Sequence, residues 1–201
     1  MNKPQLIFIA GCNAAGKSSF IRTRISGLND FEIIMTDVYK WRVKEVFKNA
    51  VKNRRNIILE TVFNDSSFKD LVDHAHNEGY VSSLIALFLD NPQHSIERVA
   101  FRTVEQSGLM ISNGNIRINF NESFKNIATY FFYFDRTDFI YTGVTGKNTK
   151  IMSFEKSVLT YYRATGLLYP QKIAQYAYQN QRMNKDAFDL ITANIDFERS
   201  L

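Results

Sequence analysis

The 201-residue sequence has little of several features that define special classes of protein. Its single cysteine, Cys12, excludes an internal disulfide framework and favours a reducing compartment. With only three prolines and no Gly/Ser-rich stretch, it shows no linker between domains. The apolar run near its start, residues 6–10, is too short for a signal-peptide core, and no other run is long enough to span a membrane. We therefore expect one soluble, cytoplasmic domain that has no membrane partner.

The chain also carries only a small excess of positive charge: its net charge is +5 and its isoelectric point is about 9.2. Such an excess suits an anionic partner, for example a nucleotide, a sugar phosphate or a nucleic acid. The densest basic cluster is only residues 52–55, which is typical of a solvated helix end. The scattered charge disfavours nucleic acid and favours a nucleotide with a small-molecule acceptor.

The order of apolar runs and amphipathic stretches predicts the fold class. Residues 5–10 form a continuous apolar run, typical of a strand buried on both faces. Further strands are expected at residues 31–35, 56–60, 80–89 and 139–141, and helices at residues 17–26, 38–55, 68–75 and from Pro92. This alternation predicts an α/β protein with a parallel sheet flanked by helices, formed by residues 1–152. We expect residues 153–201 to be a helical C-terminal extension of the same domain, with helices at residues 154–168 and 171–183 and from Asp186.

Residues 11–18 fit the phosphate-binding pattern G-x-x-x-x-G-K-[ST] at every fixed position, between an apolar strand and a helix. The two glycines let backbone N–H groups point inward at phosphate oxygens. Lys17 is expected to reach the β- and γ-phosphates, and the hydroxyl of Ser18 to bind Mg²⁺. The sequence therefore predicts a P-loop NTPase-type site for ATP and Mg²⁺, formed by Gly11, Cys12, Asn13, Ala14, Ala15, Gly16, Lys17, Ser18 and Ser19.

Three acidic residues follow predicted strands, at the edge of an α/β sheet where ligands bind. Asp37 is the candidate general base that accepts the proton of an acceptor hydroxyl, although it could simply cap the next helix. Glu60 and Thr61 are candidates for contact with the substrate, with a solvated strand end as the alternative. We interpret Asp90 as a turn residue, and the alternative is a Walker B aspartate.

Two arginines follow Pro92 on one predicted helix. Arg98 and Arg102 lie four residues apart and share a face, so they could clamp the transferring phosphoryl group, a role worth about 10³–10⁵ in rate. The alternative is a surface pair neutralised by neighbouring glutamates. Arg117 follows a stretch, residues 107–114, that we interpret as a mobile lid, and it is a further substrate-binding candidate.

With these motifs in place, the chain resembles the zeta-toxin family of P-loop kinases, in particular its short stand-alone members. The resemblance extends over about residues 5–152. It is carried, in chain order, by residues 9–18, Thr36 and Asp37, Leu59 to Thr61, residues 88–90 leading to 95–99, and residues 138–141.

The resemblance implies a kinase that moves the γ-phosphoryl group of ATP to a hydroxyl. In the better-known members the acceptor is a UDP-N-acetyl amino sugar, and the product poisons cell-wall synthesis. By motif position, Asp37 resembles the family's general base, Glu60 and Thr61 its substrate-side pair, and Arg98 and Arg102 its lid arginines. The sequence departs from the family at Asn119, where another arginine is common. The motifs do not reveal an antitoxin-like partner.

Two other functions stay open from the sequence. One is an ATP-binding regulatory or interaction module without transfer activity. It would bind ATP and yield no phosphorylated product. The other is a polynucleotide kinase, which would need a basic groove and would bind with a steep salt dependence.

Overall fold

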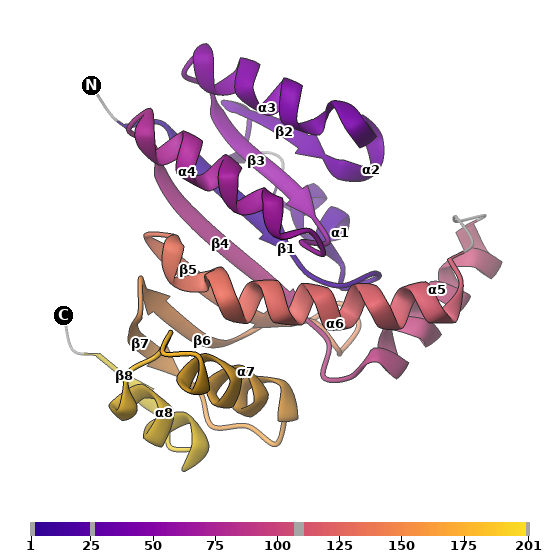
Figure 1. Cartoon of the computed structure of the whole chain (residues 1–201). Coiled ribbons are helices and arrows are strands. Elements are labelled where there is room, and N and C mark those ends of the chain that lie inside the picture. Colours follow the sequence, from indigo (N-terminus) through magenta and orange to yellow (C-terminus); the bar gives the residue numbers. More distant parts are fainter. Residues whose placement is uncertain (1–2, 25–26, 107–110, 200–201) are drawn as a thin grey trace.

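The computed structural model describes residues 3–24, 27–106 and 111–199. These residues build one 8-stranded sheet with the strand order β2-β3-β1-β4-β5-β6-β7-β8 (Figure 1). The predicted α/β class is confirmed. Within the described residues, no helix is both long and apolar enough to cross a membrane.

The first half of the sheet is parallel, as the continuous apolar runs predict. Leu6, Phe8 and Ala10 of the central strand are fully buried between neighbours on both sides. Since all the strands of this half run in one direction, their carboxyl ends meet at one edge. Its strands are β1 (Gln5–Ala10), β2 (Phe31–Met35), β3 (Asn56–Thr61), β4 (Val81–Phe88) and β5 (Arg136–Tyr141).

Helices connect and cover these strands. α3 and α4 pack on the parallel strands, and α6 crosses the front of the sheet in the view of Figure 1. The described helices are α1 (Lys17–Arg22), α2 (Thr36–Tyr39), α3 (Val43–Lys52), α4 (Lys69–Asn77), α5 (Pro92–Gln106), α6 (Asn113–Tyr130), α7 (Leu168–Gln179) and α8 (Lys185–Thr192), with short 3-10 turns η2 (Lys40–Arg42), η3 (Ser66–Phe68) and η4 (Phe131–Tyr133).

The C-terminal part departs from the prediction. The helix expected at residues 154–168 is wrong, because this segment forms most of a hairpin of β6 (Thr149–Glu155) and β7 (Val158–Tyr162). Lys156 makes the turn in the left-handed backbone region, with φ of 53°, and the strands that flank it are rich in aromatic and β-branched residues. The helices expected further on are present as α7 and α8. β6, β7 and β8 (Phe197–Glu198) extend the sheet in antiparallel fashion. The boundary that the sequence suggested between residues 152 and 153 therefore falls within one strand, β6.

An aromatic cluster joins the two halves of the sheet. Phe8 of β1 lies 5.2 Å from Phe134, between ring centroids, and Phe131 lies 4.8 Å from Phe154 of β6. All four rings are fully buried. Each contributes roughly 1.5–3 kcal/mol through burial, so Phe131 and Phe134 of the aromatic run at residues 130–134 belong to the core, and its other members pack against it.

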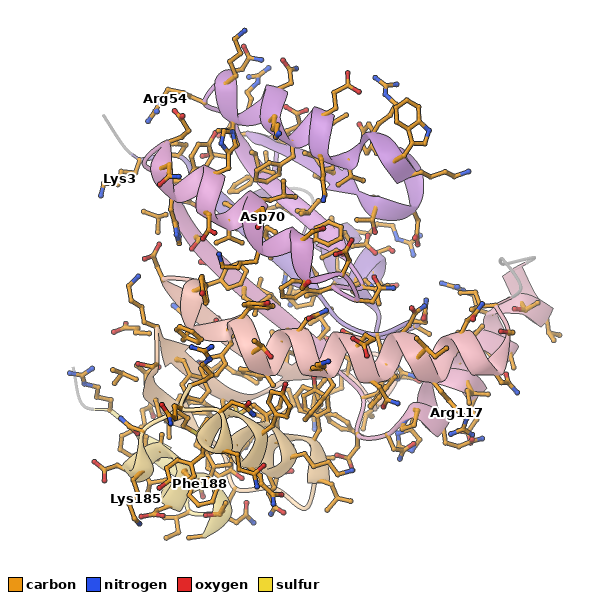
Figure 2. All side chains as sticks on the ribbon, in the orientation of Figure 1. Lys3, Arg54, Asp70, Arg117, Lys185 and Phe188 are labelled. Carbon is orange, nitrogen blue, oxygen red and sulfur yellow. The ribbon has the colours of Figure 1, made fainter. Side chains whose placement is uncertain are left out.

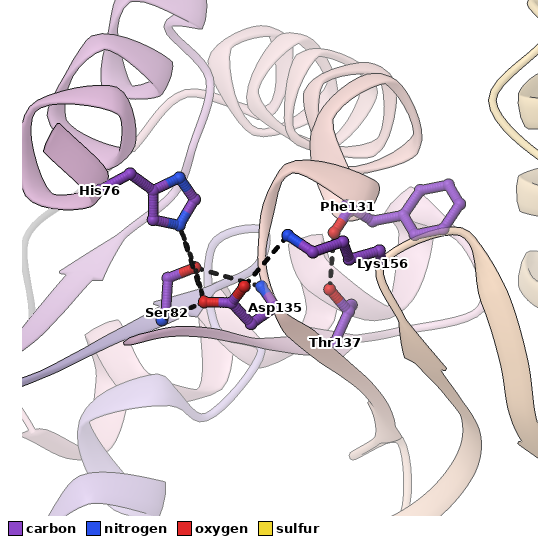
Figure 3. A network of polar contacts seen from close by, with 6 residues as sticks. All are labelled: His76, Ser82, Phe131, Asp135, Thr137 and Lys156. Carbon is purple, nitrogen blue, oxygen red and sulfur yellow. Dashed lines mark hydrogen bonds and ion pairs between the residues drawn. The ribbon is translucent and has the colours of Figure 1, made fainter. Parts of the chain in front are cut away.

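A polar network ties the amino ends of β4 and β5 to their surroundings (Figure 3). Asp135 accepts the backbone N–H of Ser82 at 2.9 Å and pairs with Lys156 at 3.0 Å. His76 of α4 lies 2.7 Å from the hydroxyl of Ser82. Burial raises the pKa of Asp135, but the hydrogen bond from Ser82 and the charge of Lys156 outweigh it and hold the pKa below its usual value. The network lies at the edge of the sheet opposite to the predicted site and holds the helix and strands together.

Candidate functional site

The phosphate loop, residues 11–18, runs from the end of β1 into α1. A Cβ on Gly11 would lie 2.1 Å from the carbonyl oxygen of Leu87, so only glycine fits between the loop and β4. Ala14 and Gly16 have φ values of 56° and 87°, which curl the backbone before the helix begins. The chain thus adopts the tightly turned loop that the sequence motif predicts.

Lys17 closes the interior of this loop. Its ammonium donates to the carbonyl oxygens of Gly11 at 3.0 Å and Cys12 at 3.2 Å, and the residue is only 8% exposed. Burial lowers the pKa of Lys17, and the negative charges of Glu60 and Asp37 act against this shift. Both partners are neutral carbonyl groups of the phosphate loop itself, and the ammonium can exchange them for phosphate oxygens bound in that loop.

Cys12 lies within the same loop as a buried, unpaired thiol. Burial raises its pKa, while the charge of Lys17 and a hydrogen bond with Ser95 act in the opposite direction. A thiol with a raised pKa is a poor nucleophile. Its place in the loop is therefore that of a small spacer.

Ser18 and Glu60 form a pair beneath the loop. The hydroxyl of Ser18 donates to Oε1 of Glu60 at 3.2 Å, because β3 pairs with β1 and sets Glu60 beside Ile9. The other oxygen, Oε2, is buried and makes no hydrogen bond to any residue that the structure describes. Burial raises the pKa of Glu60, whereas Lys17 and Ser18 lower it. A hydroxyl next to a carboxylate oxygen without a partner is the oxygen set that Mg²⁺ prefers, so these residues fit the predicted metal.

Side chains from distant segments hold the phosphate loop by its carbonyl groups. Ser95 of α5 donates to the oxygen of Asn13 at 2.6 Å, and Thr142 donates to that of Ala15 at 2.9 Å. Arg98 donates to the oxygens of Ala14 at 3.4 Å and Thr142 at 2.7 Å. Sequence reasoning missed Ser95 and Thr142 because a lone hydroxyl residue carries no recognisable signal. In this structure the predicted clamp Arg98 braces the loop.

The other arginine candidates differ in position. Arg102 is half-buried, its Nε has no hydrogen-bond partner in the described part of the chain, and its charge lowers the pKa of Lys17. Its charge is therefore close enough to act on Lys17 of the phosphate loop. Arg117 is exposed on α6 and forms no hydrogen bond or ion pair with the residues described (Figure 2). Asn119, two residues further on in α6, donates a hydrogen bond to Asn13 of the phosphate loop.

The predicted lid lies partly outside the described residues. Residues 107–110 are not described, whereas Asn113 and Gly114 begin α6. Ser112 caps this helix through its hydroxyl, which accepts the N–H of Asn115. The part of the predicted lid from Asn113 onward is therefore the first turn of a helix.

Asp37 and Thr61, the candidates at the carboxyl ends of β2 and β3, lie at the same edge of the sheet as the loop. Asp37 is exposed in the first turn of α2, and its charge acts on the pKa values of both Lys17 and Glu60. Thr61 is 1% exposed, and its hydroxyl accepts the N–H of Phe63 at 2.9 Å. Asp37 is thus exposed to solvent near Lys17 and Glu60, while Thr61 holds the turn that follows β3.

Asp90 has a structural role. Its Oδ1 accepts the backbone N–H groups of Leu168 at 2.7 Å and Tyr169 at 2.8 Å. These groups belong to the first turn of α7, so Asp90 caps a helix that follows it by almost eighty residues. Glu60, on the strand next to β1, is the acidic residue beside the phosphate loop.

Together the fold and the site define the class of P-loop kinase-like proteins. A parallel sheet carries a glycine-rich loop between β1 and α1, with a lysine inside the loop and a hydroxyl–carboxylate pair below it. More particularly, the chain belongs to the zeta toxin family, whose sequence model matches residues 29–145, over half of the chain. The phosphate loop precedes the matched segment. No curated protein sequence matches this chain significantly.

Several solved structures share the fold. One is from the PezAT chromosomal toxin–antitoxin system of the human pathogen Streptococcus pneumoniae, with a TM-score of 0.58 and 12% identity over 96% of this chain and 85% of that chain. Another is the AvrRxo1-ORF1:AvrRxo1-ORF2 complex with sulphate ions, with a TM-score of 0.60 and 12% identity over 96% and 72% of the two chains. The Pnkp1/Rnl/Hen1 RNA repair complex gives 0.52 and 23% over 61% and 45%. At these identities the likeness shows the fold alone.

Proposed function

We propose that this protein is an ATP-dependent kinase that moves the γ-phosphoryl group to a hydroxyl of a small molecule. The observation that carries the proposal is the Ser18–Glu60 pair beneath the phosphate loop, with Oε2 of Glu60 free of partners among the described residues. Burying a carboxylate anion costs free energy. A loop that bound only phosphate would gain nothing from a buried carboxylate beside it. A bound cation would offset that cost.

In this proposal the phosphate loop binds the triphosphate through its backbone N–H groups, and Lys17 moves from the loop carbonyls to the β- and γ-phosphates. Ser18 and Glu60 would hold Mg²⁺, which neutralises charge on the phosphates when bound. Arg98 would hold the loop through its hydrogen bond to Ala14, and Arg102 would add positive charge close to Lys17.

Asp37 is our candidate for the general base. It lies at the carboxyl end of β2, exposed to an incoming acceptor, and close enough for its charge to act on Lys17 and Glu60. There it would align the acceptor hydroxyl and take up its proton as the phosphoryl group is transferred. Glu60 is less suited to this role because it is buried beside Ser18.

We further propose a nucleotide sugar, such as a UDP-N-acetyl amino sugar, as the first acceptor to test, on the strength of family membership. A polar groove of about 500 Å³ beside the segment after β3 would suit a ligand rich in hydroxyl groups. It is lined by Asn64, Asp65, Ser66, Glu122, Lys125, Asn126, Thr129, Tyr130 and Tyr176.

A cytoplasmic location is part of the proposal, since ATP is its substrate and Cys12 is an unpaired thiol. An antitoxin-like partner is a further part, because one similar structure comes from a toxin–antitoxin system.

The test is label transfer. The protein is incubated with Mg²⁺, γ-labelled ATP and a pool of acceptors that includes nucleotide sugars, and products are identified by mass spectrometry. We expect label on one acceptor and a loss of about 10²–10⁴ in rate in Asp37→Asn, which cannot accept the proton. ATP binding without transfer to any acceptor would favour a regulatory module. Transfer to an added polynucleotide alone would favour a polynucleotide kinase.

A further inference from the structure

Asn119 of α6 joins two loops of the site through its side-chain amide. Its Nδ2 donates to Oδ1 of Asn13 in the phosphate loop at 2.9 Å. Its Oδ1 accepts from Nδ2 of Asn64 at 2.7 Å. Asn64 lies in the segment 62–65, which follows β3 and is called the β3 loop below. The three asparagines come from segments 106 and 55 residues apart, so this chain of hydrogen bonds exists only in the folded protein.

The chemistry of residue 119 matters for this link. A carboxamide donates and accepts at the same time, so Asn119 can hydrogen-bond to the side-chain amides of Asn13 and Asn64 together. A guanidinium only donates, so an arginine here could not accept from Asn64. A carboxylate only accepts, so with the Asn13 amide oriented as it is here an aspartate could keep the bond from Asn64 but not the bond to Asn13. With the three amides oriented in this way, the link between the two loops depends on the carboxamide of residue 119 and not on its size or polarity alone.

The β3 loop is held in a demanding conformation from the same helix. Phe63 is fully buried with φ of 57°, a left-handed conformation that costs a bulky residue about 1–3 kcal/mol. Asn126 of α6 donates to the carbonyl oxygen of Phe63 at 3.0 Å. Asn119 and Asn126 are seven residues apart and therefore lie on one face of α6. An 18-residue helix thus holds the β3 loop at two points and the phosphate loop at one.

We propose that Asn119 is a positioning residue that couples the phosphate loop to the β3 loop, so that a nucleotide on the former orders the latter. The inference rests on the proposed function, because it needs the phosphate loop to bind a nucleotide. The β3 loop begins at Val62, two residues after Glu60, and Asn64 also lines the polar groove. Order in this loop would prepare the acceptor side of the site only when the phosphate donor is present.

Hydrogen exchange measured by mass spectrometry tests the coupling. Peptides covering residues 11–24 and 61–68 are followed with and without Mg²⁺ and the non-hydrolysable analogue AMP-PNP. In the wild type we expect the nucleotide to slow exchange in both peptides. In Asn119→Ala the protection of residues 11–24 should persist, while the protection gained by residues 61–68 should fall about tenfold, as expected for the loss of two hydrogen bonds.

The matched control is Asn121→Ala, an exposed asparagine on the same helix that is expected to match the wild type. Asn64→Ala removes the hydrogen bond between the β3 loop and Asn119 at an exposed residue, and it replaces Asn119→Ala as the test variant if that protein does not fold. Unchanged coupling in Asn119→Ala, or a wild type in which only residues 11–24 are protected, would overturn the inference and leave the proposed function standing. No protection of residues 11–24 in the wild type would overturn both.

Discussion

At the scale of single residues, the site depends on one buried acidic residue, Glu60. Its carboxylate serves as partner to Ser18 and, through its charge, to Lys17. A carboxylate in this position is costly to bury, so its presence calls for a function. Metal binding would supply one, because both the charge and the oxygen without a partner would then be used.

Glu60→Gln tests this role. The amide keeps the size of the side chain but removes its charge, so we expect affinity for Mg²⁺ to fall about 10–100-fold, as found for disturbed metal sites. Nucleotide binding measured without metal should change much less. Isothermal titration with Mg²⁺ and the nucleotide, together and separately, distinguishes the two. If both affinities fall equally, Glu60 supports the loop and does not bind the metal.

At the scale of elements, contacts between distant segments decide the role of several polar residues. Asp90 caps α7, and Ser95 and Thr142 hold the phosphate loop. The sequence offers no sign of these pairs, because the partners lie 78 to 127 residues apart. Each pair anchors the start of an element or the bend of a loop, where backbone groups lack partners within the element itself.

Asp90→Ala separates capping from catalysis. We expect a loss of about 1–2 kcal/mol in the free energy of unfolding, because the N–H groups of Leu168 and Tyr169 lose their acceptor. Transfer activity and Mg²⁺ affinity should stay near wild type at temperatures where the variant is folded. Urea unfolding and the label-transfer assay measure the two effects. A collapse of Mg²⁺ affinity with unchanged stability would restore the Walker B interpretation of Asp90.

At the scale of the whole molecule, the parallel and antiparallel parts of the sheet share one aromatic core. Phe154 of β6 packs against Phe131 at 4.8 Å and Phe139 at 6.0 Å, between ring centroids. Its removal leaves a cavity, so we expect Phe154→Ala to cost about 3–5 kcal/mol. If residues 1–152 and 153–201 form one domain, hydrogen exchange in β1 and in β7 should speed up together. Faster exchange in β7 alone would indicate two units.

The polar network around Asp135 gives the molecule a pH-dependent contribution to stability. Because the folded-state pKa of Asp135 lies below its ordinary value of 3.8, this contribution is present above pH 3.8 and is lost as the pH falls through the folded-state pKa. We expect Asp135→Asn to lower the free energy of unfolding by about 1–2 kcal/mol at pH 7, a figure reduced for the partial exposure of the carboxylate. The difference from wild type should shrink as the pH falls below 3.8.

Urea unfolding at pH 7 and in acid measures this effect. Asp30→Asn, at an exposed residue with no hydrogen bond or ion pair to the described part of the chain, is the control. A destabilisation by Asp135→Asn that is equal at both pH values would mean that its charge does not contribute.

The sequence by itself determined the parts of this protein whose geometry is local. A strand, a tight turn and a helix start are encoded within residues 5–22, so the phosphate loop and the places of Lys17 and Ser18 at its end could be predicted from neighbouring residues alone. The alternation of apolar runs likewise predicted the parallel half of the sheet. The same local patterns were insufficient at residues 154–168, because aromatic and β-branched residues fit either a helix or a hairpin until they pair with β5.

Only the tertiary structure decided which distant groups meet. The strand order places β3, and not β2, beside β1, and so brings Glu60 to Ser18 and leaves Asp37 further out. The path of α6 sets Asn119 between Asn13 and Asn64. Such contacts depend on strand pairing and helix packing across the whole chain, where burial of apolar surface outweighs local preference.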